Sequence, residues 1–153
     1  MLIEVEKASK KKENKQMSLL QELKSQLDEI YADSSDLDVA NHSRKGGEWV
    51  KVADMADPEI ARNNCWAVSN EIYENFDLSA YVPLDEVDII GVEAPGCTHY
   101  AVYLTDGEES VVLDFTARQF SPDAPFPFIL PVANWHAYMN HVTGRELNLV
   151  MGD

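Results

Sequence analysis

The chain has 153 residues, of which 45% are hydrophobic and 25% charged, as expected for one globular domain. Its longest apolar run, residues 126–133, is too short to cross a membrane, and the first residues lack the apolar core of a secretion signal. Two cysteines are too few for a disulfide framework, so we expect a cytoplasmic protein.

The net charge of −15 argues against nucleic acids and membranes as partners, because such a surface repels phosphate groups. The charge is uneven. Residues 1–17 carry five lysines against three glutamates, which leaves a net −17 on the other 136 residues. We interpret residues 1–16 as a basic disordered arm, with an electrostatic binding arm as the alternative, and residues 17–153 as a single domain.

The N-terminal part of this domain begins with an amphipathic helix over residues 18–31, whose leucines and isoleucine recur every three or four positions. Ser18 and Gln21 have the spacing of a capping box at its start. Residues 32–47 are polar and predict a loop, and residues 49–52 predict a short strand.

A second helical region extends from Asp57-Pro58, a typical helix start, to Phe76. The helix either runs without interruption from Pro58 or breaks at residues 62–64 and restarts with Asn64 as its cap. We favour the restart, because asparagine is a strong cap and a weak interior residue.

The C-terminal half predicts a small sheet followed by a helix. Asp106-Gly107 separates two apolar runs, which is a strong hairpin signal. The proline-rich residues 122–131 must be extended or turning. The predicted elements are strands at 87–92, 98–104 and 109–115, a helix at 132–142 that ends at Gly144, and an edge strand at 147–151.

The hairpin brings a histidine and a carboxylate together. With Asp106 and Gly107 as the turn, Val102 faces Val111 and His99 faces Asp114 directly. An imidazole and a carboxylate so placed can form a hydrogen bond that fixes the ring tautomer and stabilises the imidazolium. A structural ion pair is the alternative interpretation.

Cys65 would lie in the first turn of the restarted helix, where the helix dipole and a nearby imidazolium lower the pKa of a thiol. The alternative is an ordinary buried cysteine. Cys97 and His99 would point to one face of a strand, but a metal site needs about four ligands and no second pair has the right spacing. The sequence contains no motif for a metal or another cofactor, and we expect neither.

Three segments occur in an order that resembles the papain-like and transglutaminase-like cysteine enzymes: Asn64-Cys65-Trp66, residues 98–102 and residues 112–116. The segment Asp114–Phe128 is similar to small bacterial and phage papain-fold proteins, including domains of the protein-glutamine deamidase type. The resemblance covers residues 58–131. It implies an α+β fold in which the helix carrying the cysteine packs on a small antiparallel sheet carrying the histidine and aspartate, here with an extra N-terminal helix.

The resemblance implies Cys65 as nucleophile, His99 as base and Asp114 as the orienting carboxylate, with Asn63 or Asn64 as side-chain donor to the oxyanion. The glutamine that many peptidases of this superfamily place before the cysteine is absent.

We therefore expect a cysteine-dependent enzyme acting on protein amides, by glutamine deamidation, peptide or isopeptide hydrolysis, or transamidation. Its acidic surface would favour a protein substrate with a basic surface. The alternatives are a non-enzymatic acidic binding or inhibitor protein that imitates nucleic acid, and a decayed papain-like fold used for binding.

Overall fold

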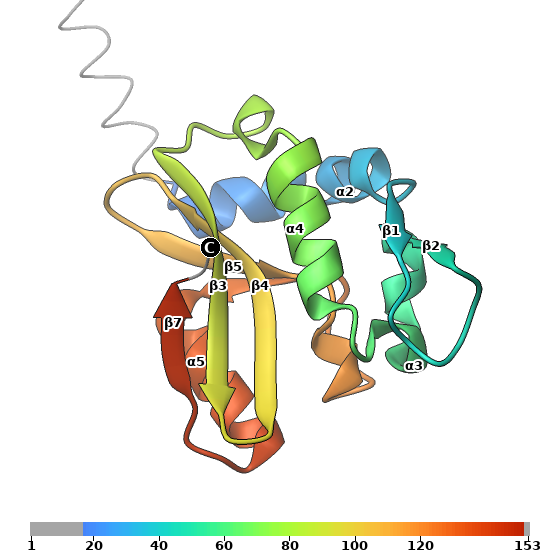
Figure 1. The fold of residues 1–153 in the computed structure, drawn as a ribbon. Helices are drawn as coiled ribbons and strands as arrows, with labels where there is room; N and C mark the ends of the chain where they lie inside the picture. Colours follow the sequence, from blue (N-terminus) through green and yellow to red (C-terminus); the bar gives the residue numbers. More distant parts are fainter. Residues whose placement is uncertain (1–16, 152–153) are drawn as a thin grey trace, which may run out of the picture.

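The structure is a computed structural model that describes residues 17–151 (Figure 1). The expected basic arm of residues 1–16 lies outside the described residues. The fold is α+β, with four α-helices, a five-stranded antiparallel sheet and a two-stranded sheet within the described range. The helices are α2 (Leu19–Ser34), α3 (Pro58–Ala61), α4 (Cys65–Asn75) and α5 (Val132–Thr143). The strands are β1 (Asp38–Ala40), β2 (Trp49–Lys51), β3 (Glu86–Ala94), β4 (Cys97–Thr105), β5 (Ser110–Asp114), β6 (Phe128–Pro131) and β7 (Asn148–Met151).

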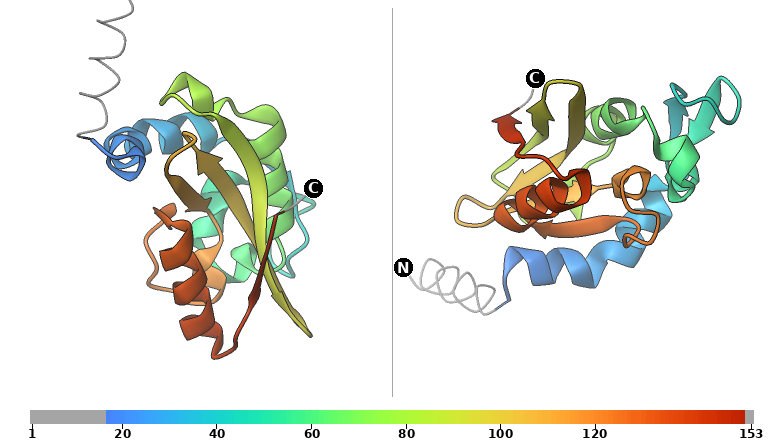
Figure 2. Two further views of the ribbon diagram at one scale, coloured as in Figure 1. Left: turned by 90° about the vertical axis from the view of Figure 1, so that its left-hand side faces the viewer. Right: turned by 90° about the horizontal axis from the view of Figure 1, so that it is seen from below.

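The five-stranded sheet has the order β6-β5-β4-β3-β7 and carries a hydrophobic core on each face. One core joins α2 and α4 to side chains such as Val102 and Leu113, and the other joins α5 to side chains such as Ala101 and Val112. The left view of Figure 2 shows the sheet passing between α5 and α4. Because successive side chains of a strand point to opposite faces, β4 contacts both layers.

Several local predictions are confirmed. Helix α2 begins after Ser18, whose capping box with Gln21 is formed in both directions, and extends three residues beyond the predicted end. Helix α5 ends at Gly144, which adopts a left-handed conformation with a φ of 68°. Residues 148–151 form the edge strand β7 beside β3.

The prediction of a continuous loop over residues 32–47 is wrong. Residues 32–34 complete α2, and residues 38–40 form β1, which pairs antiparallel with β2. Val39 and Val50 are directly opposed, and both are buried in the core. Asp38 before Val39 and the polar residues 41–43 after Ala40 conceal this short apolar pattern in the sequence.

The predicted hairpin register is also wrong, by two residues. Val102 pairs with Leu113 rather than Val111, and Thr105 pairs with Ser110. A two-residue turn of the type I′ needs positive φ at both central positions, and in this turn only Gly107 has one. The Asp106 carboxylate instead accepts the backbone N–H groups of Glu108 and Glu109. These bonds fix a four-residue loop, 106–109.

Candidate active site

Helix α4 starts at Cys65, as the restart interpretation predicts. Helix α3 ends at Ala61, and Asn63 takes a left-handed conformation with a φ of 70° that separates the two helices. The thiol therefore belongs to the first residue of an 11-residue helix, where unpaired backbone N–H groups and the helix dipole favour a negative charge. The Cys65 side chain is buried, with 9% of the residue exposed.

Asn64 stands at the cap position, but its side chain does not cap the helix. Its Oδ1 accepts the backbone N–H of His42 at 2.7 Å, while its Nδ2 donates to Asn41 Oδ1 at 2.9 Å and to the Ile60 carbonyl at 2.7 Å. Both amide hydrogens are thus already donated, so this side chain is not available as the expected oxyanion donor. Asn64 instead holds the β1–β2 loop against the start of α4.

His99 and Asp114 form a buried pair. The His99 Nε2–H donates to Asp114 Oδ2 at 2.7 Å, and the two residues are 0% and 1% exposed. The same Oδ2 accepts the Trp135 indole N–H at 2.9 Å, and Oδ1 accepts the Thr116 backbone N–H at 2.8 Å. These hydrogen bonds replace the ones that the carboxylate would make with water if it were exposed. Because the Nε2 side of the ring is bonded to Asp114, Nδ1 is the ring nitrogen left for other partners.

The thiol meets the imidazole at an open edge of β4. Strand β5 pairs with β4 only from Val102 to Thr105, so residues 97–101 of β4 are paired on the β3 side alone. There the Cys65 thiol reaches His99 and the backbone N–H of Tyr100. His99 lies on the α5 side, where its ring is 5.9 Å from that of Trp135, whereas Cys65 comes from the opposite layer. The early end of β5 is what lets the two groups meet.

The thiol and the imidazole shift each other's protonation. Burial acts to raise the pKa of Cys65, but the hydrogen bond and charge of His99 and the Tyr100 N–H outweigh it, so this pKa is below its ordinary value. Burial acts to lower the pKa of His99, but the charge and hydrogen bond of Asp114, together with the thiol, raise it to about 10. For Asp114, burial is outweighed by His99 and the other donors, so its pKa is lowered. The geometry thus favours a thiolate beside an imidazolium.

Three residues around this pair were not anticipated from the sequence. Gln119 follows Asp114 in a short 3-10 helix, Ala117–Gln119, and its Nε2 lies 3.1 Å from His99 Nδ1, to which it donates when the ring is neutral. The Phe120 ring meets the imidazole edge-on at 4.9 Å, and Trp135 bonds the carboxylate. The one signal in the sequence was Trp135 itself, because a tryptophan buried on a predicted helix needs an acceptor for its indole N–H.

Among residues 17–151, neither Asn63 nor Cys97 makes a hydrogen bond to Cys65 or His99. Asn63 is exposed and lines a cavity beside the start of α4. Cys97 packs in the α5 core, and both cysteines are free thiols. Within residues 17–151, no group of three or more His, Cys, Asp or Glu side chains is arranged to hold a metal ion. None of the helices in that range has the length and apolar character needed to span a bilayer.

Comparisons of the chain with protein-family models, curated proteins and solved structures give no match. The family resemblance inferred from the sequence therefore stays a hypothesis.

Proposed function

We propose that this protein is a cysteine-dependent enzyme that transfers the acyl group of protein amides, with Cys65 as nucleophile, His99 as base and Asp114 as orienting carboxylate. The observation that carries the proposal is the continuous chain of contacts from the thiol at the start of α4 through the imidazole to a fully hydrogen-bonded carboxylate. A buried cysteine with a purely structural role has no need of such partners.

The first half of the reaction forms a thioester. In the thiolate–imidazolium pair the Cys65 proton is already on His99, and the thiolate attacks the carbonyl carbon of the amide. The C–N bond then breaks, and the imidazolium returns the proton to the leaving nitrogen. Asp114 accepts the His99 Nε2–H at 2.7 Å and stabilises the charged ring while it holds the proton.

The second half frees the product. Water attacks the thioester carbonyl while His99 takes one of its protons, the C–S bond breaks, and the thiol is restored. The released nitrogen compound is ammonia if the amide is a glutamine side chain, and an amine if it is a peptide or isopeptide bond. Attack by a lysine amine instead of water gives transamidation. All of these reactions use the same residues and need no cofactor.

Two donors are available for the negative oxygen of the tetrahedral intermediate. The backbone N–H of Cys65 belongs to the first turn of α4 and has no partner within that helix. The Gln119 side-chain amide lies 3.1 Å from His99 Nδ1 and makes no other side-chain hydrogen bond among residues 17–151. Since the Asn64 amide is occupied, Gln119 is the better side-chain candidate for this role.

The same geometry supports a papain-like architecture as part of the proposal. The helix that begins with the cysteine packs against β4, and the two other members come from neighbouring antiparallel strands. This order of nucleophile, base and carboxylate is the one the resemblance implies. The acidic surface favours protein substrates whose wider surface is basic.

The experiment compares the wild type with Cys65→Ala in a cell lysate, followed by mass spectrometry of all proteins, with Cys97→Ala as the matched control. Glutamine-to-glutamate changes produced by the wild type and by Cys97→Ala would support deamidation. New peptide ends would indicate a protease, and new isopeptide links a transglutaminase. Identical proteomes with all three proteins would contradict an enzyme and favour the acidic binding protein.

A further inference from the structure

A cavity of about 600 Å³ opens beside the start of α4, and its lining comes from two segments. Arg62 and Asn63 belong to the turn just before the helix, and Arg44 and Lys45 to the β1–β2 loop, with Glu59 completing the wall. Asn63 precedes the proposed nucleophile by two residues, so their Cα atoms are at most about 7 Å apart. The part of the cavity wall formed by Asn63 therefore lies within the span of a dipeptide from the Cys65 backbone.

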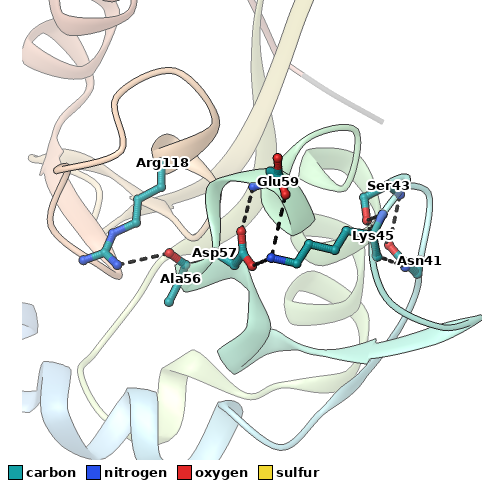
Figure 3. A network of polar contacts seen from close by, with 7 residues as sticks. All are labelled: Asn41, Ser43, Lys45, Ala56, Asp57, Glu59 and Arg118. Atoms are coloured by element: carbon teal, nitrogen blue, oxygen red, sulfur yellow. Dashed lines mark hydrogen bonds and ion pairs between the residues drawn. The ribbon is translucent and has the colours of Figure 1, made fainter.

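The cavity is a basic site on an acidic molecule. Between residues 17 and 151 the sequence has 23 acidic residues and seven lysines and arginines, and three of these seven line this one cavity. Lys45 is hydrogen-bonded to Asp57 and lies 3.7 Å from Glu59, so its charge is compensated (Figure 3). Within the described residues no acidic side chain pairs with Arg44 or Arg62. Two guanidinium groups are therefore left for a ligand, and their planar donors match a carboxylate.

The two segments are held in place by hydrogen bonds. Asn64 bonds both the His42 backbone and the Asn41 side chain, which fastens the β1–β2 loop to the turn that carries Arg62. Within that loop, Asn41 Nδ2 donates to the carbonyls of Lys45 and Gly47, both at 2.8 Å. The contacts of Asn41, Lys45 and Asp57 form one continuous network (Figure 3). The cavity is thus built from ordered backbone next to the cysteine.

We propose that this cavity binds a carboxylate of the substrate, so that the amide attacked by Cys65 lies one or two residues from an acidic group of the same peptide. The carboxylate belongs to an aspartate or glutamate side chain or to a free C-terminus. This inference rests on the proposed function and adds a specificity to it. The acidic remainder of the surface repels anions, so the attraction is confined to this site.

The test is a titration of ¹⁵N-labelled Cys65→Ala, followed by NMR, with three peptides that differ only in one group: Ac-Gln-Glu-NH₂, Ac-Gln-Gln-NH₂ and Ac-Gln-Gln-OH. We expect saturable shifts of the amides of Arg44, Lys45, Arg62 and Asn63 with a carboxylate peptide, and binding about tenfold weaker with the neutral one. Preference for the first peptide identifies a side-chain carboxylate as the ligand, and preference for the third identifies a free C-terminus. Equal binding of all three, or shifts elsewhere only, would overturn the proposal.

Two variants localise the effect. Arg44→Gln and Arg62→Gln should each weaken binding of the carboxylate peptide about tenfold, whereas Arg145→Gln, beyond the end of α5, should leave it unchanged. In a background that retains Cys65, the control variant Arg145→Gln should react with iodoacetamide at the wild-type rate. Absence of a carboxylate preference in the protein that keeps both arginines, together with normal thiol reactivity of Cys65, would contradict this inference alone. An unreactive thiol in a protein that still selects the carboxylate would contradict the proposed enzyme alone.

Discussion

Asp114 lies diagonally across the sheet from His99, not directly opposite it, and the two side chains nevertheless form a hydrogen bond of 2.7 Å. Extending the β4–β5 register places Asp114 beside Ala101, two residues from His99. A shift of two keeps both side chains on one face, and an imidazole is long enough to span the diagonal. The diagonal placement also leaves the Nδ1 side of the ring to Gln119 and the thiol.

Asp114→Asn should change the pH dependence of stability. The carboxylate holds the His99 pKa at about 10, against burial that acts to lower it, so the protonated ring stabilises the folded state fully below its unfolded pKa of about 6.5. This stabilisation is lost as the pH rises from about 6.5 to about 10. The deficit of Asp114→Asn in free energy of unfolding should therefore be largest near pH 6 and smaller near pH 10, as measured by urea denaturation.

Asp123→Asn is the matched control, because Asp123 is exposed. Its unfolding free energy should differ from that of the wild type by a nearly constant amount over the same pH range. A deficit of Asp114→Asn that is the same at pH 6 and pH 10 would mean that His99 is not protonated in the folded protein.

Trp135→Phe should destabilise the protein by about 1–3 kcal/mol, since it removes a buried donor from a buried carboxylate. The indole is fully buried and its N–H lies 2.9 Å from Asp114 Oδ2. Urea denaturation at pH 7 measures the effect. Trp49→Phe is the control, because Trp49 is 64% exposed and should change stability by less than about 0.5 kcal/mol. Equal effects of the two variants would contradict a role for the indole in supporting Asp114.

Gln119→Leu should lower the pH at which Cys65 becomes reactive. The Gln119 amide can donate to His99 Nδ1 only while the ring is neutral, so this bond favours the neutral ring, and its loss favours the imidazolium that stabilises the thiolate. The midpoint of iodoacetamide labelling against pH measures the shift. Gln26→Leu on α2, far along the chain from this site, should leave the midpoint unchanged. A midpoint that rises in Gln119→Leu would contradict the assigned direction of this hydrogen bond.

Local signals in the sequence predicted most of the elements around the site. Ser18, Asp57-Pro58 and Gly144 mark helix ends through their own backbone and cap chemistry, which depends little on the rest of the chain. The restart of the helix before Cys65 was predictable on the same ground. The role of Asn64 in this restart was not predictable, because its side chain bonds the distant loop at residues 41–42 instead of its own helix.

The contacts that complete the site depend on tertiary structure. The hairpin register follows from side-chain bonds of Asp106, which a dipeptide turn rule does not include. Gln119 reaches His99 because the segment after Asp114 folds back, anchored where Arg118 donates to the carbonyls of Ala56 and Ala124. Such long-range bonds leave no periodic pattern in the sequence.

Selective alkylation measures whether His99 activates Cys65 as a thiolate. At pH 6, where a thiol with an ordinary pKa near 8.5 is mostly protonated, iodoacetamide should label Cys65 much faster than Cys97, as followed by peptide mass spectrometry. His99→Ala should slow the labelling of Cys65 and leave that of Cys97 unchanged. Slow labelling of both cysteines at equal rates in the folded wild type, with no effect of His99→Ala, would mean that His99 does not activate Cys65.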